Sequence, residues 1–232
     1  MIKIFESEVL SVKQENDSVK ILKFSVPEDF DFKPGQYVSL TIPFDGKKLR
    51  RPYSIASSPG KDFIELCVKI VDGPGSKFIN SLVEGGKVEF FGPAGKFVID
   101  EDAKNNDMIF VAVGTGITPF ASMIENLLDI GFQKKIILLK GFRYEENILY
   151  DEKFSKLAEK HNNFKFYNIL SRPKNQEFGN KGYVQNFLEK YLPENFQGNI
   201  YICGLSPMIN SVKDKLISLG IWRERIFYEK YD

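Results

Sequence analysis

The segment Arg50-Arg51-Pro52-Tyr53-Ser54 places three side chains of different chemistry next to one another. Pro52 favours extended backbone around it, and successive side chains of a strand point to opposite faces, which separates Tyr53 from Ser54. A fixed guanidinium, a flat phenol and a hydroxyl suit a ligand with a phosphate, a planar ring and a polar edge, such as a flavin nucleotide. The same residues also fit an ordinary edge strand with a surface arginine and a half-buried tyrosine.

The turn Gly73-Pro74-Gly75-Ser76 is a second candidate for ligand binding. We expect a short helix to begin near Ser76 and to run to Val83. Flexible glycines and an N-capping serine ahead of free backbone N–H groups make an arrangement that binds phosphate. A capped helix after a turn, with no ligand, fits the same residues.

The composition excludes several classes of partner. A chain of 232 residues, 43% hydrophobic, can form two domains that each bury a core. Its 32 basic and 31 acidic residues are well mixed along the sequence. Because this gives no broad basic field, we expect neither nucleic acid nor an anionic membrane as partner.

The cysteines and the N-terminus indicate a cytoplasmic protein. Cys67 and Cys203 lie far apart and share no close spacing with other cysteines, so we expect no metal centre built within this chain. The sequence MIKIFESEVLSV lacks a basic region followed by an apolar core, and no run approaches the roughly 18 apolar residues of a membrane span. A reducing, cytoplasmic setting follows.

Residues 1–100 form the first predicted domain, a small closed antiparallel barrel of six strands. The strands are rich in β-branched and aromatic residues, and turn signals such as Lys33-Pro34-Gly35 separate them. The expected strands are Ile2–Val12, Val19–Val26, Tyr37–Ile42, Tyr53–Ala56, Phe63–Val71 and Lys87–Phe91.

Residues 101–232 form the second predicted domain. A polar segment at 100–107 is followed by strands that alternate with helices, which indicates a doubly wound α/β fold around a five-stranded parallel sheet. The expected strands are Met108–Val113, Lys135–Gly141, Phe164–Leu170, Gly198–Cys203 and Ile226–Tyr228. The expected helices are Pro119–Ile130, Tyr150–His161, Tyr183–Tyr191 and Pro207–Leu219.

Ligands of such sheets bind at the carboxyl ends of the strands. The segment Gly114-Thr115-Gly116-Ile117-Thr118 follows the first strand and should receive a pyrophosphate on its backbone amides. It departs from the dinucleotide fingerprint, because Pro119 replaces the third glycine and Arg143 stands near the end of the second strand where an acid would bind ribose. The missing acid leaves room for a 2′-phosphate.

Polar residues also follow the third strand, namely Ser171, Arg172, Lys181, Tyr183 and Gln185. A serine, a guanidinium and an ammonium that converge on one strand end would suit a 2′-phosphate. Tyr183 could stack on adenine. A solvated basic loop is the alternative.

Cys203-Gly204 ends the fourth strand. A small side chain followed by a glycine allows a planar ring to approach closely. A buried structural cysteine is the alternative.

Taken together, segments that occur in one order along nearly the whole chain resemble the ferredoxin–NADP reductase family of flavoproteins. They are RPYS at 51–54, GPGS at 73–76, GPAGKF at 92–97, GTGITPF at 114–120, SR at 171–172, KGYVQ at 181–185, CG at 203–204 with Met208 beyond it, and EKYD at 229–232.

The resemblance implies an FAD-binding barrel followed by an NAD(P)-binding domain. In the family, the arginine of RPYS holds the flavin pyrophosphate and the tyrosine stacks on the flavin ring. The serine, here Ser54, forms a hydrogen bond near N5 of the flavin. By the same resemblance, further flavin contacts fall on Pro52, Cys67, Val68, Lys69, Gly75 and Ser76.

For the nicotinamide nucleotide, the family places the cysteine near the chain end, here Cys203, beside the carbon that gives up hydride. A glutamate and an aromatic at the terminus, here Glu229 and Tyr231, complete that site. The remaining nucleotide contacts fall on Gly114, Thr115, Gly116, Thr118, Gly204 and Met208, together with the residues after the third strand.

The implied activity is hydride transfer between NADPH and bound FAD, and single-electron transfer to or from a ferredoxin or flavodoxin. Two alternatives stay open, a free-flavin reductase and a reductase subunit of a larger electron-transfer complex.

Overall fold

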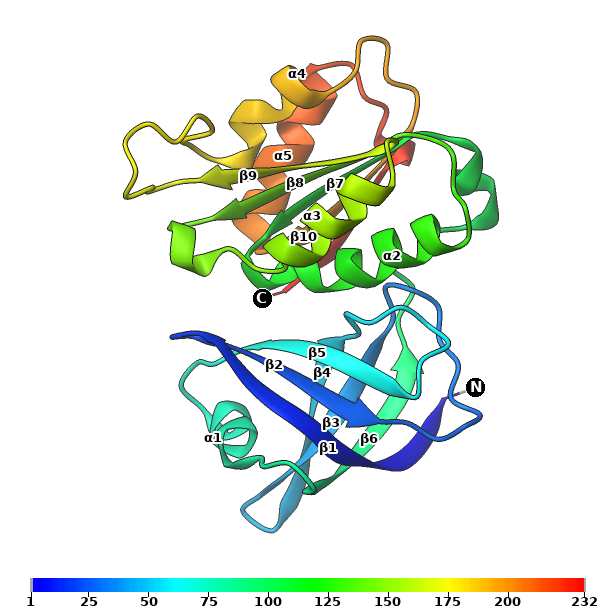
Figure 1. Cartoon of the computed structure of the whole chain (residues 1–232), viewed down its shortest axis with the longest axis vertical. Helices are drawn as coiled ribbons and strands as arrows, with labels where there is room; N and C mark the ends of the chain where they lie inside the picture. Colours follow the sequence, from blue (N-terminus) through cyan, green and yellow to red (C-terminus); the bar gives the residue numbers. More distant parts are fainter. Residues whose placement is uncertain (1, 232) are drawn as a thin grey trace. The chain divides into compact units, whose positions relative to one another are not determined.

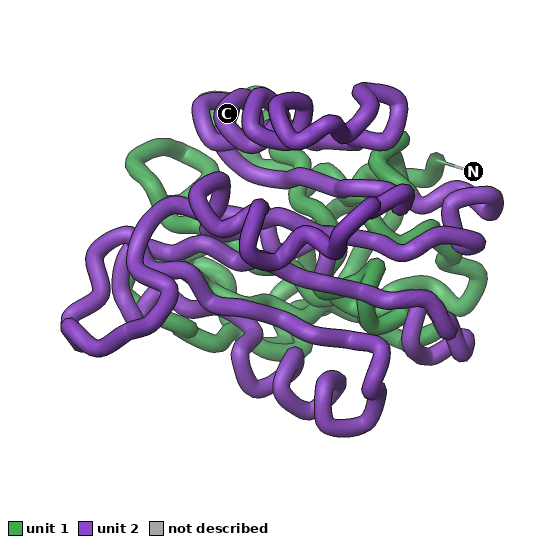
Figure 2. The backbone as a smooth tube through the Cα atoms, turned by 90° about the horizontal axis from the view of Figure 1, so that it is seen from above, with its two compact units in different colours: residues 1–98, 121–126 green, residues 99–120, 127–232 purple. Residues whose placement is uncertain are grey.

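The structure is a computed structural model that describes residues 2–231, so that Asp232 of the EKYD segment lies outside the described residues. The chain divides into two compact units (Figures 1 and 2). The barrel unit comprises residues up to Val98 together with 121–126, and the sheet unit comprises the rest of the chain from Ile99. No helix within residues 2–231 is long and apolar enough to cross a membrane.

The barrel unit contains six strands that pair only in the antiparallel sense, in the order β4-β3-β6-β1-β2-β5. After β4, Ile55 forms a bridge with Leu66, and the Ala56 N–H donates to the Glu65 carbonyl at 2.8 Å. This contact joins the two outer strands and confirms the predicted barrel. The strands are β1 (Lys3–Asn16), β2 (Val19–Ser25), β3 (Tyr37–Phe44), β4 (Lys47–Ser54), β5 (Phe63–Lys69) and β6 (Lys87–Ala94).

The barrel core follows from the alternation of side chains along its strands. Along β1, Phe5, Ser7 and Val9 are buried while their neighbours are exposed. The Phe24 and Phe90 rings, both fully buried, meet edge to face with centroids 5.0 Å apart. The aromatic residues that indicated strands therefore also fill the interior.

The fourth strand begins earlier than predicted, at Lys47 and not at Tyr53, and it ends at Ser54. Asp45 and Gly46 both have positive φ, 49° and 67°, and join Phe44 to Lys47 in a two-residue hairpin. An Asp-Gly pair between two strands is a known hairpin signal, and the predicted strand bounds did not take it into account. The hairpin gives the RPYS segment a paired partner along its whole length in β3.

The helix of the barrel unit, α1 (Pro74–Ser81), begins two residues before the predicted start. Gly73, with φ 142°, occupies the N-cap position, and Pro74 fits the first turn because its missing N–H would have no helical partner. Ser76 is therefore not the capping residue. Its buried Oγ accepts a hydrogen bond from the Val71 N–H at 2.9 Å.

The sheet unit is a parallel sheet in the order β11-β10-β7-β8-β9, which confirms the doubly wound prediction. Its strands are β7 (Met108–Val113), β8 (Ile136–Phe142), β9 (Phe164–Leu170), β10 (Asn199–Gly204) and β11 (Ile226–Lys230). Its helices are α2 (Thr118–Asp129), α3 (Asp151–Lys160), α4 (Leu188–Tyr191) and α5 (Ser206–Ser218). Short 3₁₀ turns, labelled η1 to η5, span Glu101–Asn105, Gly114–Ile117, Glu145–Asn147, Val184–Phe187 and Arg223–Arg225.

Helices cover both faces of this sheet (Figure 1). On one face, Ile209 and Leu216 of α5 and Leu188 of α4 pack into one cluster with strand residues. On the other face, Phe120 of α2 contacts Phe110 with ring centroids 5.0 Å apart, and α3 packs on β9. Strands buried on both sides explain the nearly continuous apolar runs in the sequence.

The helix predicted at Tyr183–Tyr191 is a four-residue 3₁₀ turn, η4, followed by the four-residue α4. Tyr183 is extended. The Tyr191 ring stacks on Tyr167 with centroids 3.9 Å apart, and its hydroxyl donates to Asn180 Oδ1 at 2.7 Å. These tertiary contacts fix the segment and override its helical pattern.

A fully buried lysine, Lys140, lies on the face of β8 covered by α3. Its Nζ donates to Asp151 Oδ1 at 2.8 Å and to the Leu149 carbonyl at 3.2 Å, between the Phe154 and Phe166 rings. Burial lowers the pKa of Lys140 from 10.5 to about 8, and the contact with Asp151 opposes that effect. The buried positive charge of protonated Lys140 therefore lowers the stability of the folded state.

We predict that this loss of stability makes the free energy of unfolding depend on pH. The pKa of Lys140 is depressed in the fold, so the destabilisation is fully present below pH 8 and disappears as the pH rises to about 10.5. Relative to Lys140→Met, which cannot titrate, the wild type should gain roughly 3 kcal/mol of unfolding free energy over this range. Denaturant unfolding at several pH values measures the difference, and parallel pH profiles for the two proteins would contradict the assignment.

Candidate active site

The RPYS segment lies at the end of β4, and its burial increases along the segment. Arg51 and Pro52 are exposed, Tyr53 is half-buried against the barrel core, and Ser54 is buried. Burial raises the pKa of Tyr53, and the positive charge of Arg51 opposes that rise. At neutral pH the segment therefore presents a cation beside a neutral phenol.

The first turn of α1 lies against this segment. A Cβ atom placed on Gly75 would lie 3.7 Å from Arg51 Cγ and 3.8 Å from Tyr53 Oη. The first turn carries no acidic side chain, and the first N–H groups of a helix have no partner within the helix. A guanidinium, a phenol ring and free helical N–H groups thus meet in one place, and this donor set fits a phosphate joined to a planar ring.

The third predicted flavin segment is the carboxyl end of β5. Cys67 and Val68 are buried there, and Lys69 is exposed. The bridge between Ile55 and Leu66 brings the end of β4 to β5, so that their neighbours Ser54 and Cys67 lie at the same junction. The structure therefore brings the predicted flavin residues of β4, α1 and β5 into one unit, around the ends of adjoining elements.

In the sheet unit, the loop after β7 touches the end of β10. Gly114, with φ 58°, opens the turn η2. A Cβ atom on Gly116 would lie 2.3 Å from the Cys203 carbonyl oxygen and 2.9 Å from the Gly204 nitrogen. Glycine at 116 is therefore required by close backbone packing, in addition to any role with a ligand.

Thr118 has a structural contact within this loop. Its side chain is buried, and its Oγ1 donates to the Thr115 carbonyl at 2.7 Å. The hydroxyl thus braces the turn, while Gly114 and Thr115 are half-exposed. A ligand at this loop would contact backbone more readily than the Thr118 hydroxyl.

Cys203, Glu229 and Tyr231 come together at the end of β10. Cys203 pairs with Glu229 across the parallel strands, and the Tyr231 N–H donates to the Gly204 carbonyl at 2.9 Å. Burial raises the pKa of the Cys203 thiol well above its usual value, the charge of Glu229 adds to this, and a hydrogen bond with Tyr231 opposes it. The thiol is therefore neutral and unsuited to nucleophilic attack.

Gly204 and Met208 adjoin this cluster. Gly204 has φ 148°, and a Cβ atom there would lie 2.7 Å from Met208 Cε and 3.4 Å from the Val113 carbonyl oxygen. Both the GTG and the CG segments thus depend on glycine for the same contact region. Sequence reasoning found both segments but not that they touch.

The residues predicted after the third strand gather at the end of β9. The Ser171 and Arg172 N–H groups donate to the Phe142 and Arg143 carbonyls at 3.0 and 2.8 Å. Lys181 forms a bridge with Leu170, which returns it to the same strand end. Tyr183 is 62% exposed and Gln185 is half-exposed just beyond.

Glu145 also belongs to this edge of the sheet, and the sequence analysis did not predict a role for it. The Glu145 carboxylate accepts hydrogen bonds from the backbone N–H groups of Lys174 and Asn175. These partners lie 29 and 30 residues away, so no local pattern marks the contact.

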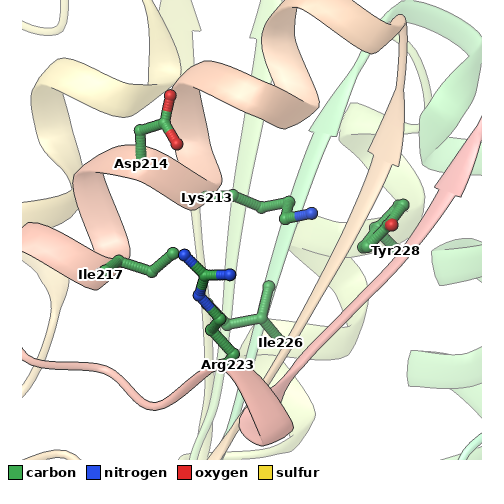
Figure 3. A pocket seen from close by; sticks show the side chains of 6 residues that line it. All are labelled: Lys213, Asp214, Ile217, Arg223, Ile226 and Tyr228. Atoms are coloured by element: carbon green, nitrogen blue, oxygen red, sulfur yellow. The ribbon is translucent and has the colours of Figure 1, made fainter.

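A groove of about 360 Å³ lies at the other edge of the sheet, beside α5 and β11 (Figure 3). Lys213 Nζ sits 4.0 Å from the centre of the Tyr228 ring across it. Arg223, Asp214, Ile217 and Ile226 complete the lining. The groove is thus separated from the Ser171 and Arg172 edge by the width of the sheet.

Comparison with known proteins identifies the family. Residues 6–99 match the oxidoreductase FAD-binding domain and residues 110–214 match the oxidoreductase NAD-binding domain. The chain is 32% identical to ferredoxin–NADP reductase B of Sorangium cellulosum over 98% of each protein. The chain belongs to the ferredoxin–NADP reductase family.

Two further comparisons fit this family. The ferredoxin–NADP reductase of Plasmodium falciparum has the same fold, with a TM-score of 0.84 over 98% of this chain and 96% of that one, at 24% identity. The reductase component of a Pseudomonas phenol 2-monooxygenase is 33% identical over 92% of this chain, which spans 62% of that protein. As a ferredoxin–NADP reductase family member, the chain is an FAD-dependent NAD(P)H oxidoreductase.

We predict that Gly116→Ala disturbs the contact between the β7 loop and β10. The added methyl group would meet the Cys203 carbonyl at 2.3 Å, so the backbone must shift, at a cost of about 1–3 kcal/mol. Gly179→Ala is the matched control, because nothing lies within 4 Å of a Cβ atom there. Denaturant unfolding should find Gly116→Ala destabilised and the control unchanged. Equal stability of the two variants would show that the loop packs less tightly than described.

Proposed function

We propose that this chain oxidises NADPH with bound FAD and passes the electrons to a ferredoxin or a flavodoxin. The observation that carries the proposal is the meeting of Arg51, Tyr53 and the first turn of α1 in the barrel unit. When bound, FAD exchanges a hydride with NADPH and single electrons with a protein acceptor, which amino-acid side chains cannot do. The chain's own residues bind and orient the two nucleotides.

In the barrel unit, Arg51 and the first-turn N–H groups of Gly75 and Ser76 would neutralise and bind the flavin pyrophosphate. The Tyr53 ring would lie against the isoalloxazine, and Pro52 would keep the segment extended. The Ser54 hydroxyl and the end of β5, from Cys67 to Lys69, would contact the polar edge of the ring.

In the sheet unit, the backbone of Gly114, Thr115 and Gly116 would receive the pyrophosphate of NADP, with Thr118 bracing the loop. Ser171, Arg172 and Lys181 would bind the 2′-phosphate, with Tyr183 against adenine and Gln185 beside it. This assignment is supported by the convergence of the first three residues at the end of β9.

Cys203 would contact the nicotinamide ring, with Glu229 and Tyr231 beside it, while Gly204 and Met208 shape the approach. A neutral, buried thiol suits an orienting contact. Its contribution would fall on the transition state of hydride transfer, through position and close packing.

The acceptor is proposed from the relatives. The match to the Sorangium reductase covers 98% of both proteins, which favours a separate ferredoxin as partner. The match to the phenol monooxygenase component favours a second candidate, a reductase subunit that serves an oxygenase. We further propose a cytoplasmic location, which agrees with the reduced thiols of Cys67 and Cys203. We also propose a domain boundary near residue 100.

Assays of the purified chain distinguish these candidates. A ferredoxin–NADP reductase should retain FAD through gel filtration and reduce added ferredoxin or flavodoxin with NADPH. Loss of the flavin, with NADPH-dependent reduction of added free flavin, would identify a flavin reductase instead. Retained FAD with transfer only to an oxygenase partner would favour the subunit.

We predict that Arg51→Ala gives a folded protein that has lost most of its FAD. A charged hydrogen bond to phosphate contributes about 1.5–3 kcal/mol. Arg50→Ala is the matched control, because the Arg50 guanidinium stacks 4.3 Å from the Phe91 ring and Phe91 belongs to β6. FAD content after dialysis and the Kd for added FAD measure the effect. Equal FAD affinity in Arg51→Ala and wild type would refute the phosphate contact.

We predict that Cys203→Ser slows flavin reduction by NADPH. The substitution keeps the size nearly constant and changes the contact with the nicotinamide, so kcat and kcat/KM should fall together while the Kd for NADPH stays nearly constant. Stopped-flow absorbance at saturating NADPH measures the step. A wild-type rate combined with lower thermal stability would assign Cys203 to the core alone.

A further inference from the structure

The segment from Ser171 to Lys181 carries the residues proposed for the 2′-phosphate, yet most of it is exposed and irregular. Its first residues continue the pairing of β8 and β9 beyond the strands, through the N–H bonds of Ser171 and Arg172 to the Phe142 and Arg143 carbonyls. Leu170 N–H donates to the Asn180 carbonyl at 3.0 Å and closes the base of the segment. Between Arg172 and Asn180, the backbone requires further hydrogen-bond partners to hold its position.

Glu145 supplies that support. Its Oε2 accepts from the Lys174 N–H at 3.0 Å, and its Oε1 accepts from the Asn175 N–H at 2.9 Å. One carboxylate therefore binds two successive backbone groups, as a neighbouring strand would do. The two N–H bonds hold the pKa of Glu145 below its usual range, so the carboxylate is ionised at neutral pH.

The neighbouring residue adds a second contact. Lys174 Nζ lies 2.7 Å from Glu146 Oε1, so that the side chain and the N–H of Lys174 both bind the turn η3. Arg172 thus has fixed backbone on either side, at Ser171 and at Lys174. A guanidinium on fixed backbone loses less conformational entropy when it binds an anion than one on a mobile loop.

We propose that Glu145 is a positioning residue for NADP selectivity, which holds the segment 171–181 so that Arg172 can reach a 2′-phosphate. The inference rests on the proposed function of Arg172. Glu145 itself touches only backbone of this segment in the contacts described, and it does not bind the nucleotide.

The sign of the effect separates positioning from simple electrostatics. Glu145 is a negative charge near the proposed 2′-phosphate site, so charge repulsion alone predicts that its removal tightens binding of a 2′-phosphate. Positioning predicts the opposite, because the N–H groups of Lys174 and Asn175 lose their acceptor and the segment loosens. The two explanations therefore give opposite changes in affinity.

The test uses calorimetric titration of the full-length, FAD-containing protein with adenosine 2′,5′-bisphosphate and with 5′-AMP, which differ only in the 2′-phosphate. Glu145→Ala should weaken bisphosphate binding roughly tenfold and leave 5′-AMP binding unchanged. Glu145→Gln, which keeps one acceptor oxygen, should fall between Ala and wild type. Glu159→Gln, which removes an equal charge from an exposed position on α3, is the control and should behave as wild type.

Steady-state kinetics provide a second readout. In Glu145→Ala the KM for NADPH should rise while kcat and the KM for NADH stay constant. Tighter or unchanged bisphosphate binding overturns the inference, and so does an equal loss for both ligands, which would indicate general loosening of the fold.

Binding of the 2′-phosphate by Arg172 and positioning by Glu145 are tested separately. If wild type and Arg172→Ala bind the bisphosphate equally, the 2′-phosphate site is not at this edge, and the inference fails with it. If Arg172→Ala loses the preference and Glu145→Ala keeps it, the proposed function survives and only the positioning role is refuted.

Discussion

The candidate nucleotide site of the sheet unit depends on close backbone packing that only glycine permits. At Gly116 a side chain would collide with the Cys203 carbonyl at 2.3 Å, and this contact joins the loop after β7 to the end of β10. In the barrel unit, the first turn of α1 lies close to Arg51 and Tyr53, and a Cβ atom at Gly75 would be 3.7 and 3.8 Å from their side chains. We propose that peptide N–H groups approach a ligand directly at both places, so that the two units offer phosphate the same kind of backbone site.

Charge is arranged locally, in a chain whose net charge is only +1. Arg51 at the barrel and Arg172 at the sheet each stand where the sequence predicts a phosphate. Cys203, by contrast, is kept neutral by burial and by the nearby charge of Glu229. Charged arginines at the proposed phosphate positions and a neutral thiol at the proposed nicotinamide position fit a protein that binds two anionic nucleotides and leaves the redox chemistry to them.

Much of the fold could be predicted from the sequence, because apolar runs and turns mark its elements. The predicted strands Met108–Val113 and Phe164–Leu170 coincide with β7 and β9. The start of β4 was wrong because the hairpin at Asp45-Gly46 was overlooked, and Ser76 was misassigned as a cap because Pro74 already begins the helix. The contacts of Lys140 and Glu145 join residues distant in sequence or buried by packing, so local patterns could not reveal them.

We propose that this one chain binds FAD and takes hydride preferentially from NADPH. The most direct measurement is the absorbance spectrum of the purified protein under anaerobic conditions, before and after equal additions of NADPH or NADH. We expect flavin bands in the purified protein and faster bleaching of those bands with NADPH than with NADH. A protein that shows no flavin bands after reconstitution with FAD, or that is bleached faster by NADH, would contradict it.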